Sequence, residues 1–446
     1  MAERRMPGSA RGGRVDRDPP SYYRRVSRRP SKPFVVHMAI GIMCLMVSGG
    51  KVARGDKAPV VNDHGQRSFL KDHWRLPIPP QGKPPARFSA LEASLDSEGC
   101  AVCHRSQYDD WMTSVHSKSM GPGVTGQTME MIQGDPSGAL LCYSCHAPLS
   151  EQQERLRGKG GSQTRFKRNP AFVASMQSKG LTCAGCHVRK HRRFGPPKRD
   201  GSIENSLPAS QLPHGGAIRT PAFERAEFCN ACHQFDPDGY ALNGKLLENT
   251  YNEWKEGPYA REGRECQSCH MPDRRHLWRG IHDPEMVKQG VTVRLTLERK
   301  RYQVGDQVQA VVTLANTGVG HYFPTYVTPK VVVRFELVDE KGRGLEGSFQ
   351  EERVGREVTL DLSRELFDTR IPPGKSHSVS YARTISQSGL RLKASIVVSP
   401  DDFYIRFFEA KLREAKTRKA RDLLHEALGA ARKSSFILFE EEVVLS

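Results

Sequence analysis

Two cysteines separated by two residues and followed at once by a histidine form a unit that recurs five times between residues 100 and 270. Ten of the eleven cysteines belong to these units, and only Cys44 lies outside them. Thiols at this spacing can bond covalently to a porphyrin, and the adjacent histidine can then ligate its iron. In chain order, units 1 to 5 are Cys100, Cys103 and His104; Cys142, Cys145 and His146; Cys183, Cys186 and His187; Cys229, Cys232 and His233; and Cys266, Cys269 and His270.

Other uses of such a unit fit the repeat less well. A structural zinc site takes paired Cys-x-x-Cys units to make four ligands and does not need a histidine after every second cysteine. A disulfide framework does not repeat one short spacing five times. The repeat therefore predicts five covalently attached c-type haems, with the unit histidines as their proximal iron ligands.

The composition agrees with a chain that builds part of its interior from cofactor. Of the 446 residues, 37% are hydrophobic, and Gly (40) and Pro (29) are frequent. A chain of this length predicts two or three domains. The segment 100–290 is too polar to close a core of side chains alone. We therefore expect porphyrins to supply the missing apolar mass, and the segment to be unfolded without haem.

The formal net charge of +18 does not indicate a nucleic-acid-binding protein. Residues 1–32 carry ten Lys and Arg against three Asp and Glu, so +7 of the charge lies there and +11 remains for the rest of the chain. Two propionates on each of five haems would offset most of that excess. We therefore expect no nucleic-acid partner.

Residues 1–50 have the pattern of an export signal. A long basic segment precedes an apolar run from Phe34 to Val47, which His37 interrupts and small residues follow. The run is shorter than the roughly 20 residues of a membrane-spanning helix, so a cleaved signal peptide is the first interpretation and an uncleaved signal anchor in the inner membrane is the alternative. In either case the rest of the chain is predicted to be periplasmic or otherwise exported.

The remaining chain divides into three parts by composition. Residues 51–95 contain the proline-rich stretch Leu76–Pro85 and are predicted to be extended, with His64 and His73 on the surface rather than on an iron. Residues 96–288 hold the five units and are the predicted haem domain, which is mainly helical or irregular. Residues 289–446 form a predicted immunoglobulin-like β-sandwich with a long helix. The predicted fold class is therefore α+β.

Histidines outside the units are candidates for the sixth, distal ligand of each iron. Tyr108, Trp111, Met112 and Val115 have the spacing of an amphipathic helix, and His116 follows on nearly the same face. This helix leads away from unit 1, so we expect His116 to serve a neighbouring haem. The further candidate ligands are His191, His214, His276, His282 and His321.

Other segments of the haem domain have less specific patterns. The loop Val188–Arg199 is dense in cations, which we interpret as partners of haem propionates, with a docking patch for an anionic partner or an oxyanion as the alternative. Helices are predicted over Glu151–Arg157, Ala171–Lys179 and Leu242–Trp254.

From Val291 onward, β-branched runs separated by Gly and Pro turns predict several short strands. His321 lies between two of them, in the loop Asn316–Thr325, and is predicted to reach from the sandwich into the haem domain. The predicted strands are Val291–Leu297, Gln307–Leu314, Lys330–Val338, Val358–Leu362, His377–Ala382 and Leu390–Val398, followed by a helix over Asp401–Lys433 and a last strand over Phe436–Leu445.

These motifs resemble those of the multihaem c-type cytochromes of nitrogen and sulfur respiration, a superfamily that includes pentahaem nitrite reductases and octahaem hydroxylamine oxidoreductases. Besides the units, the resemblance rests on Tyr108, Trp111, Ser114 and His116, on Met271, Pro272 and His276, and on the loop Gly320–Thr325. It implies closely packed haems, many of them with two histidine ligands, that conduct electrons. The catalytic haem of those nitrite reductases is carried by Cys-x-x-Cys-Lys, which this sequence lacks, and the hydroxylamine enzymes carry more haems. Catalytic residues are therefore not transferred.

An electron carrier is the predicted function. Sixteen histidines, less five in the units and one in the signal, leave ten for five distal positions, so the count does not require an open iron. The predicted partners are other redox proteins: c-type cytochromes, a membrane quinol dehydrogenase or a terminal reductase. The alternative is an oxidoreductase that acts on a small nitrogen or sulfur oxyanion at one open haem. Its hydrogen-bond donors would come from Arg192, Arg193, Tyr251 or Tyr259.

Overall fold

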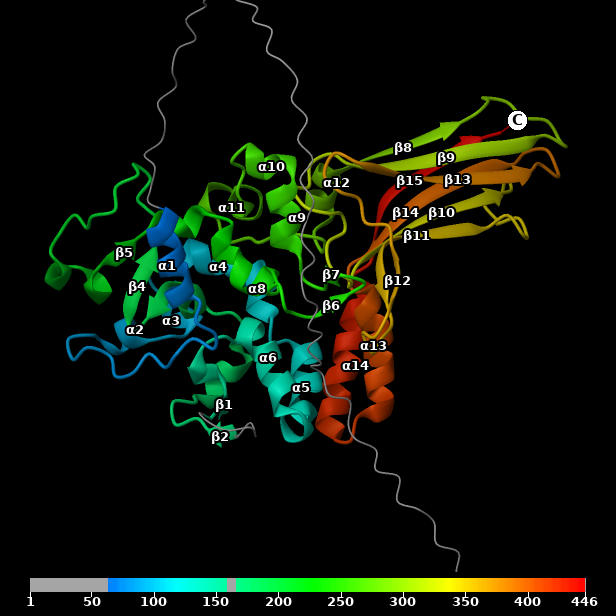
Figure 1. The fold of residues 1–446 in the computed structure, drawn as a ribbon. Coiled ribbons are helices and arrows are strands. Elements are labelled where there is room, and N and C mark those ends of the chain that lie inside the picture. Colours follow the sequence, from blue (N-terminus) through cyan, green and yellow to red (C-terminus); the bar gives the residue numbers. More distant parts are fainter. Residues whose placement is uncertain (1–62, 159–165, 446) are drawn as a thin grey trace, which may run out of the picture. The chain divides into compact units, whose positions relative to one another are not determined.

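Short helices make up most of the first part of the chain, and long strands most of the second (Figure 1). The computed structural model describes residues 63–158 and 166–445. The fold class is α+β, as predicted. The predicted export signal lies outside the described residues. Within the ranges that are described, no helix is both long and apolar enough to cross a membrane.

Helices of the haem domain are short because glycines, prolines and the units interrupt them. Four of them, α5, α6, α10 and α12, begin with a proline, whose fixed φ suits the first helical position. The helices are α1 (Asp63–His73), α2 (Ala90–Ala93), α3 (Ser97–Ala101), α4 (Arg105–Thr113), α5 (Pro122–Gly134), α6 (Pro136–His146), α7 (Cys183–His187), α8 (Glu227–His233), α9 (Thr250–Glu256), α10 (Pro258–Arg261), α11 (Cys266–His270) and α12 (Pro284–Gly290). The short strands are β1 (Arg155–Arg157), β2 (Phe166–Arg168), β3 (Val188–Arg189), β4 (Arg192–Gly195), β5 (Ala217–Arg219), β6 (Ala241–Leu242) and β7 (Lys245–Leu246).

The described part of the segment 51–95, from residue 63 onward, is more ordered than predicted, because α1 and α2 lie within it. Its proline-rich stretch is non-helical, but it packs into the domain: Ile78 is fully buried and forms a parallel bridge with Leu149. The prediction of a surface position for His73 was wrong, since this residue is 2% exposed. The side chain of His64 is outside what the structure describes.

Two predicted helices were replaced by other structure because side chains compete for the backbone. Over Glu151–Arg157 the chain forms a 3₁₀ turn and then strand β1, which pairs with β2. The buried amide of Gln152 donates to the carbonyls of Met176 and Gly180, which fixes the turn. Over Ala171–Lys179 only a 3₁₀ helix forms, at Ala174–Lys179.

The predicted helix Leu242–Trp254 begins later than expected. Asn243 and Gly244 both have positive φ, 51° and 73°, and make the tight turn between β6 and β7. An Asn-Gly pair is a strong hairpin signal, so this turn overrides the helical pattern around it. The helix, α9, starts only at Thr250.

Residues from Val291 onward form two antiparallel sheets that pack face to face. The larger sheet has the strand order β12-β11-β10-β14-β15 and the smaller β13-β9-β8. Phe335 of the larger sheet stacks on Tyr381 of the smaller one, with ring centroids 5.1 Å apart, so the two sheets share one core. The strands are β8 (Val291–Leu297), β9 (Gln307–Asn316), β10 (Lys330–Val338), β11 (Gln350–Val358), β12 (Glu365–Asp368), β13 (Ser376–Thr384), β14 (Arg391–Ser399) and β15 (Phe436–Val444).

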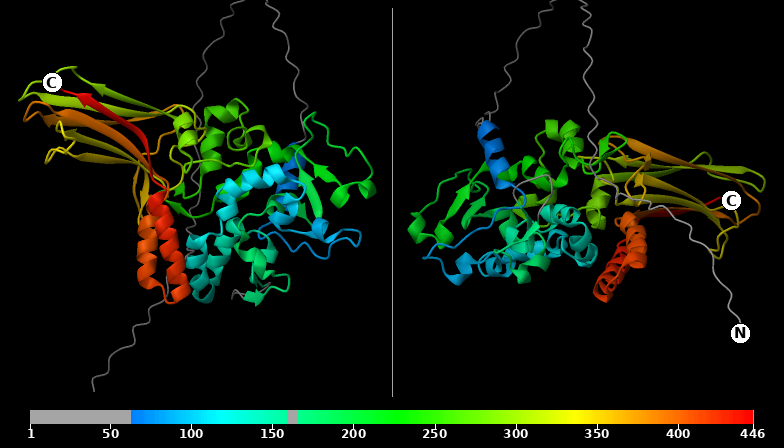
Figure 2. Two further views of the ribbon diagram at one scale, coloured as in Figure 1. Left: turned by 180° about the vertical axis from the view of Figure 1, so that it is seen from behind. Right: turned by 60° about the horizontal axis from the view of Figure 1, so that its bottom comes forward.

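Two predictions in this region were wrong in their bounds. The strand predicted over Val358–Leu362 lies earlier, as β11, because the chain turns after Val358 and Leu362 has a φ of 57°. The predicted helix over Asp401–Lys433 is a hairpin of α13 (Asp402–Glu414) and α14 (Arg418–Lys433). Figure 2 shows this hairpin beside α5. The carboxylate of Glu130 in α5 accepts hydrogen bonds from the backbone N–H groups of Lys416 and Thr417, which stabilises the break between α13 and α14.

Candidate functional site

Each unit forms about one helical turn. The structure places units 2, 3, 4 and 5 at the ends of α6, α7, α8 and α11, and unit 1 at the junction of α3 and α4. Residues three and four apart lie on the same face of a helix, so both thiols and the histidine of a unit face the same side. All ten thiols are free. The donors are therefore placed as covalent attachment of a porphyrin requires.

Four of the five unit histidines have a hydrogen-bond partner at Nδ1. The Nδ1 atoms of His146, His187 and His270 lie 2.7, 2.8 and 2.6 Å from the backbone carbonyl oxygens of Ser119, Phe194 and Arg279. That of His233 lies 2.6 Å from the phenol oxygen of Tyr326. A histidine that donates from Nδ1 keeps the Nε2 lone pair for a metal. The second coordination shell therefore has the form that iron ligation needs.

Three unit histidines face a histidine from elsewhere in the chain. Ring centroids are 6.1 Å apart for His187 and His276, 6.1 Å for His233 and His116, and 6.4 Å for His270 and His321. The planes of the last pair differ by only 10°. The structure thus brings together three of the predicted distal ligands with three units.

The ring separation in these pairs matches an iron held between two imidazoles. With metal–nitrogen bonds of about 2 Å and roughly 1 Å from each nitrogen to its ring centre, the two centroids would be about 6 Å apart. Burial lowers the pKa of His187, His233 and His321 to about 4 and that of His116 to about 3. The rings are therefore neutral at neutral pH, the state in which imidazole ligates metals. The residues present fit a bis-histidine haem.

Units 1 and 2 differ from the other three. For unit 1, His214 is the neighbouring candidate: burial lowers its pKa, and the charges of Arg193 and His104 lower it further. Its Nδ1 lies 3.1 Å from the carbonyl oxygen of Gly216, which leaves Nε2 free. Among the described residues, no histidine ring is paired in this way with His146 of unit 2.

Two predicted ligands are not brought to a unit. The Nε2 atom of His191 lies 3.0 Å from the carbonyl oxygen of Gly82. His282 is 43% exposed at its side chain, and its Nε2 lies 3.1 Å from the carboxylate oxygens of Asp401. His73, which sequence reasoning placed on the surface, packs among aromatic rings with its Nε2 2.8 Å from the carbonyl oxygen of Cys186.

The surroundings of unit 2 contain acidic groups that sequence reasoning did not single out. Burial and the nearby Cys145 raise the pKa of Glu248 to about 8. Burial, Glu248 and Asp401 raise the pKa of Tyr404, in α13, to about 12, with Cys142 of unit 2 also contributing. These residues come from segments 100 to 260 positions further along the chain, and no local pattern links them to unit 2.

Three of the four donors predicted for an open haem already donate hydrogen bonds to other groups. The guanidinium of Arg193 donates to the carbonyls of Glu92 and His191. The hydroxyls of Tyr251 and Tyr259 donate to Glu227 and to the carbonyl of Thr317. The first part of the cationic segment Val188–Arg199 is the β3–β4 hairpin rather than an open loop, and Arg189 and Arg193 donate to backbone carbonyls.

Thiols of different units lie close together. The thiols of Cys100 and Cys183, of Cys145 and Cys232, and of Cys229 and Cys266 lie close enough to shift each other's pKa. Unit 1 is thus next to unit 3, and unit 4 is next to both unit 2 and unit 5. The charge of Cys186 also acts on Cys229 and Cys232, so unit 3 adjoins unit 4. All five units are connected.

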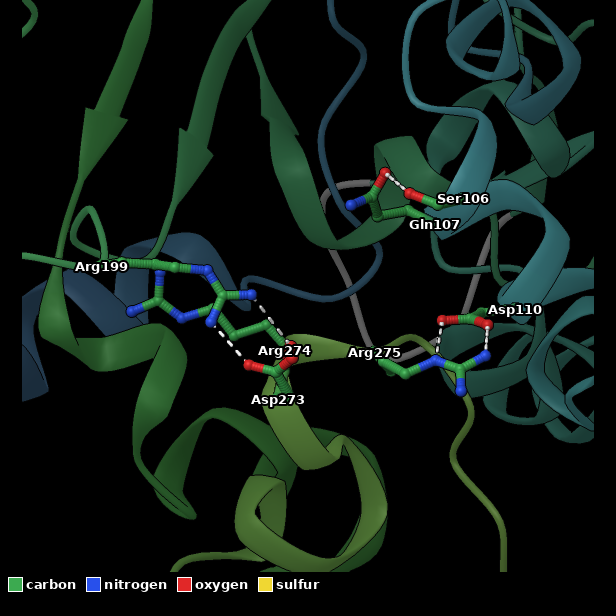
Figure 3. A pocket seen from close by; sticks show the side chains of 7 residues that line it. All are labelled: Ser106, Gln107, Asp110, Arg199, Asp273, Arg274 and Arg275. Atoms are coloured by element: carbon green, nitrogen blue, oxygen red, sulfur yellow. Dashed lines mark hydrogen bonds and ion pairs between the residues drawn. The ribbon is translucent and has the colours of Figure 1, made fainter.

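A surface pocket of about 460 Å³ lies beside unit 1 (Figure 3). Its lining arginines have carboxylate partners: Arg199 with Asp273 and Arg275 with Asp110, each at 2.6 Å, and Arg274 with Glu224 beyond the pocket wall. Asp110 also accepts from the backbone N–H of His276 at 3.1 Å. The pocket's ion pairs therefore position the histidine that faces unit 3, rather than leaving a free anion site. Its lining residues are Ser106, Gln107, Asp110, Arg199, Asp273, Arg274 and Arg275.

With this geometry in place, comparison with known families gives one match. Residues 99–188 match the family of cytochrome c554 and c-prime. This segment holds units 1, 2 and 3. No curated protein gives a match.

Among solved structures, the fold is similar to that of a penta-heme cytochrome c552 from Thermochromatium tepidum, with a TM-score of 0.52 and 18% sequence identity over 79% of this chain and 99% of that chain. The sporulation control protein Spo0M from Bacillus subtilis shows 10% identity over 25% of this chain and 43% of that chain, at a TM-score of 0.12, which is too low to carry an argument. The family match and the shared fold support a multihaem c-type cytochrome with covalently bound haem c.

Proposed function

We propose that the chain is an exported electron carrier that binds five c-type haems and passes electrons between other redox proteins. Each unit would hold one haem through its two thiols, with the unit histidine as proximal ligand. His276, His116 and His321 would complete the iron coordination at units 3, 4 and 5, and His214 at unit 1. Bound haem supplies one-electron chemistry, and the chain's residues set its ligation and surroundings.

The observation that carries this proposal is the pairing of histidines across units 3, 4 and 5. An iron with two histidine ligands is coordinatively saturated, so it exchanges electrons without binding a substrate. The separations of 6.1, 6.1 and 6.4 Å agree for three pairs that come from unrelated parts of the sequence. A common spacing at three independent places supports a common ligand geometry.

An electron carrier with several haems also needs a continuous path for electrons, and the closeness of the units to one another provides it. Unit 1 adjoins unit 3, unit 3 adjoins unit 4, and unit 4 adjoins units 2 and 5. Haems anchored at such thiols would lie close together, and electron transfer is fast over short distances. We therefore infer that unit 4 is the branch point of the path. The partners that we propose are c-type cytochromes, a membrane quinol dehydrogenase or a terminal reductase.

Two measurements on the exported protein test this function. Intact mass should show five added haems, and EPR of the oxidised protein should show low-spin signals from the haems of units 1, 3, 4 and 5. A protein without a Soret band, or with high-spin iron at units 3 to 5, would contradict the proposal.

A second candidate function is favoured by one observation, the lack of a facing histidine at His146 among the described residues. Glu248 and Tyr404 lie near unit 2 instead, and both can donate protons. A haem there with an open position could take a small nitrogen or sulfur oxyanion and reduce it with electrons from the other four haems. The carboxyl and phenol groups would then supply protons to the substrate oxygen.

The two candidates differ in the EPR signal of unit 2. The enzyme hypothesis requires a high-spin ferric signal that shifts when nitrite or hydroxylamine is added. Replacing Glu248 with Gln should then slow turnover while the four other haems keep their spectra. If all five haems are low-spin and the spectrum does not change with either compound, the enzyme hypothesis is wrong and the electron-carrier function stands.

A further inference from the structure

Tyr326 is the one side chain, among the described residues, that holds a unit histidine at Nδ1. Its phenol oxygen lies 2.6 Å from His233, and the two rings are 6.4 Å apart and inclined by only 29°. The three other units with an Nδ1 partner use backbone carbonyl oxygens for the same contact. Only at unit 4 can the hydrogen-bond partner of the proximal ligand therefore be changed by a side-chain substitution.

The direction of this hydrogen bond follows from ligation. When Nε2 of His233 binds iron, the imidazole proton is on Nδ1, so His233 donates and the phenol oxygen accepts. A tyrosine phenol is protonated at neutral pH, because its ordinary pKa is about 10, so the oxygen 2.6 Å from Nδ1 is that of a neutral phenol. A neutral phenol is a weaker acceptor than a carboxylate. It orients the ring and adds moderately to the basicity of the ligand.

The segment that carries Tyr326 is fixed on both sides. It connects β9 with β10 in the sandwich and also contains His321, which faces unit 5. The buried carboxylate of Glu253, in α9 of the haem domain, accepts from the backbone N–H of Tyr322 at 3.3 Å and from Thr325 Oγ1 at 3.1 Å. The Thr325 hydroxyl also lies 2.7 Å from that of Thr250.

The arrangement is preorganised at the backbone as well. Tyr326 has a φ of 65°, a left-handed conformation that non-glycine residues adopt only when their surroundings impose it. Arg370 of the sandwich pairs with Glu253 at 2.7 Å and compensates its buried charge. The contacts that hold this turn therefore also fix the position of the phenol oxygen.

We propose that Tyr326 is a positioning residue that sets the orientation and donor strength of His233, and through them the reduction potential of the haem at unit 4. This inference rests on the proposed haem ligation and adds a role for the sandwich. One loop of that domain supplies the distal ligand of one haem and the hydrogen-bond acceptor of another. Since unit 4 adjoins units 2, 3 and 5, its potential governs how electrons divide among them.

The test is a spectroelectrochemical titration of the haem-loaded Tyr326→Phe variant. Without the acceptor, His233 donates less charge to iron, the ferric state loses stabilisation, and the potential of one haem should rise. We expect a change of up to roughly tenfold in the reduction equilibrium, which is about 59 mV for one electron. The low-spin EPR signal of the same haem should shift.

Two further variants separate this role from a merely structural one. Tyr326→Gln offers an amide oxygen, an acceptor like the backbone carbonyls of the other units, and should bring the potential back toward that of the natural protein. Tyr322→Phe is the matched control: this tyrosine is in the same loop, and its hydroxyl makes no hydrogen bond within the part of the chain that the structure describes. It should leave all five potentials unchanged.

The outcomes distinguish this inference from the function on which it rests. Intact mass and an unchanged distal-ligand spectrum establish that haem is attached and ligated in each variant. The haem that shifts must be the one whose spectrum changes in His116→Met, because His116 faces unit 4. Five unchanged potentials in Tyr326→Phe, or equal shifts in the Phe and Gln variants, would overturn the role of Tyr326 and leave the carrier function standing.

Discussion

At the scale of single residues, the histidine pairs allow a direct test of ligation. Replacing His276 or His321 with Met exchanges an imidazole for a weak thioether ligand, so one haem in each variant should change its EPR signal and rise in potential. His282 is the matched control, since it lies near the same segment but pairs with Asp401 on the surface. The prediction is contradicted if His282→Met changes a haem spectrum and the other two do not.

The spacing within a unit could be recognised from the sequence because covalent attachment is local. The distal ligands are different, since His321 is 51 positions from His270 and His116 is 117 positions from His233. Six histidines were candidates because of their positions in the sequence, which does not say which ring nitrogen a fold leaves free. In the structure, carbonyls hold Nδ1 of His276 and His321, whereas Nε2 of His191 is taken by Gly82.

At the scale of helices and strands, the sandwich was the more predictable part. Alternating burial along β8 and β9 follows directly from their alternating pattern, and β8 and β10 have the predicted bounds. Elements of the haem domain were less predictable, because their side chains bond distant backbone rather than their own helix. Gln152 and the Asn243-Gly244 turn are two such cases, and only the second has a local signal.

The helical hairpin of α13 and α14 gives a prediction at this scale. It packs on α5 so closely that a Cβ atom at Gly126 would lie 3.1 Å from Leu424 Cγ and 3.3 Å from Leu423 Cβ. Gly126→Leu should therefore push the helices apart at a cost of about 1–3 kcal/mol. A lower melting temperature of the haem-loaded protein, followed by circular dichroism at 222 nm, would show this.

A matched variant on the same helix separates packing from helix propensity. A Cβ atom at Gly134 would meet no atom within 4 Å, so Gly134→Leu changes propensity without a clash. Gly134→Leu should melt at the same temperature as the natural protein or slightly above it.

The haem at unit 2 gives a second measurement. Since Tyr404 of α13 lies near Cys142, Gly126→Leu should also alter the spectrum of this haem, and Gly134→Leu should not. Equal melting temperatures would refute the close packing.

At the scale of the whole described fold, hydrogen bonds and ion pairs join the sandwich to the haem domain. Arg356 is fully buried in β11, and its guanidinium donates to the carbonyls of Leu242, Lys245 and Leu246 in the β6–β7 hairpin. Asp368 of β12 lies 2.6 Å from the Lys245 ammonium. Such contacts keep the loop with His321 and Tyr326 at a fixed position relative to the units. This position could not have been predicted from the sequence pattern of either domain alone.

Asp368 makes the stability of this junction depend on pH. Burial alone would raise its pKa, but hydrogen bonds from Arg370 and Lys245 outweigh burial and hold the pKa of Asp368 well below its usual range. Because the folded pKa is depressed, the stabilisation is fully present above the unfolded value of about 3.9 and is lost as the pH falls through the folded pKa. The other charged groups at this point are Glu253, Arg356 and Glu365.

Asp368→Asn should therefore lower the stability at pH 7 by on the order of 2 kcal/mol, the range of hydrogen bonds to charged groups. The difference in melting temperature between Asp368→Asn and the natural protein should shrink steadily below about pH 4, because the unfolded chain then takes up a proton at Asp368 that the folded protein, with its depressed pKa, does not. Asp422→Asn, on the exposed face of α14, is the control and should melt like the natural protein at every pH. If the difference for Asp368→Asn instead stayed constant from pH 7 to pH 3, its origin would be packing, and the charge of Asp368 would not hold the sandwich against the haem domain.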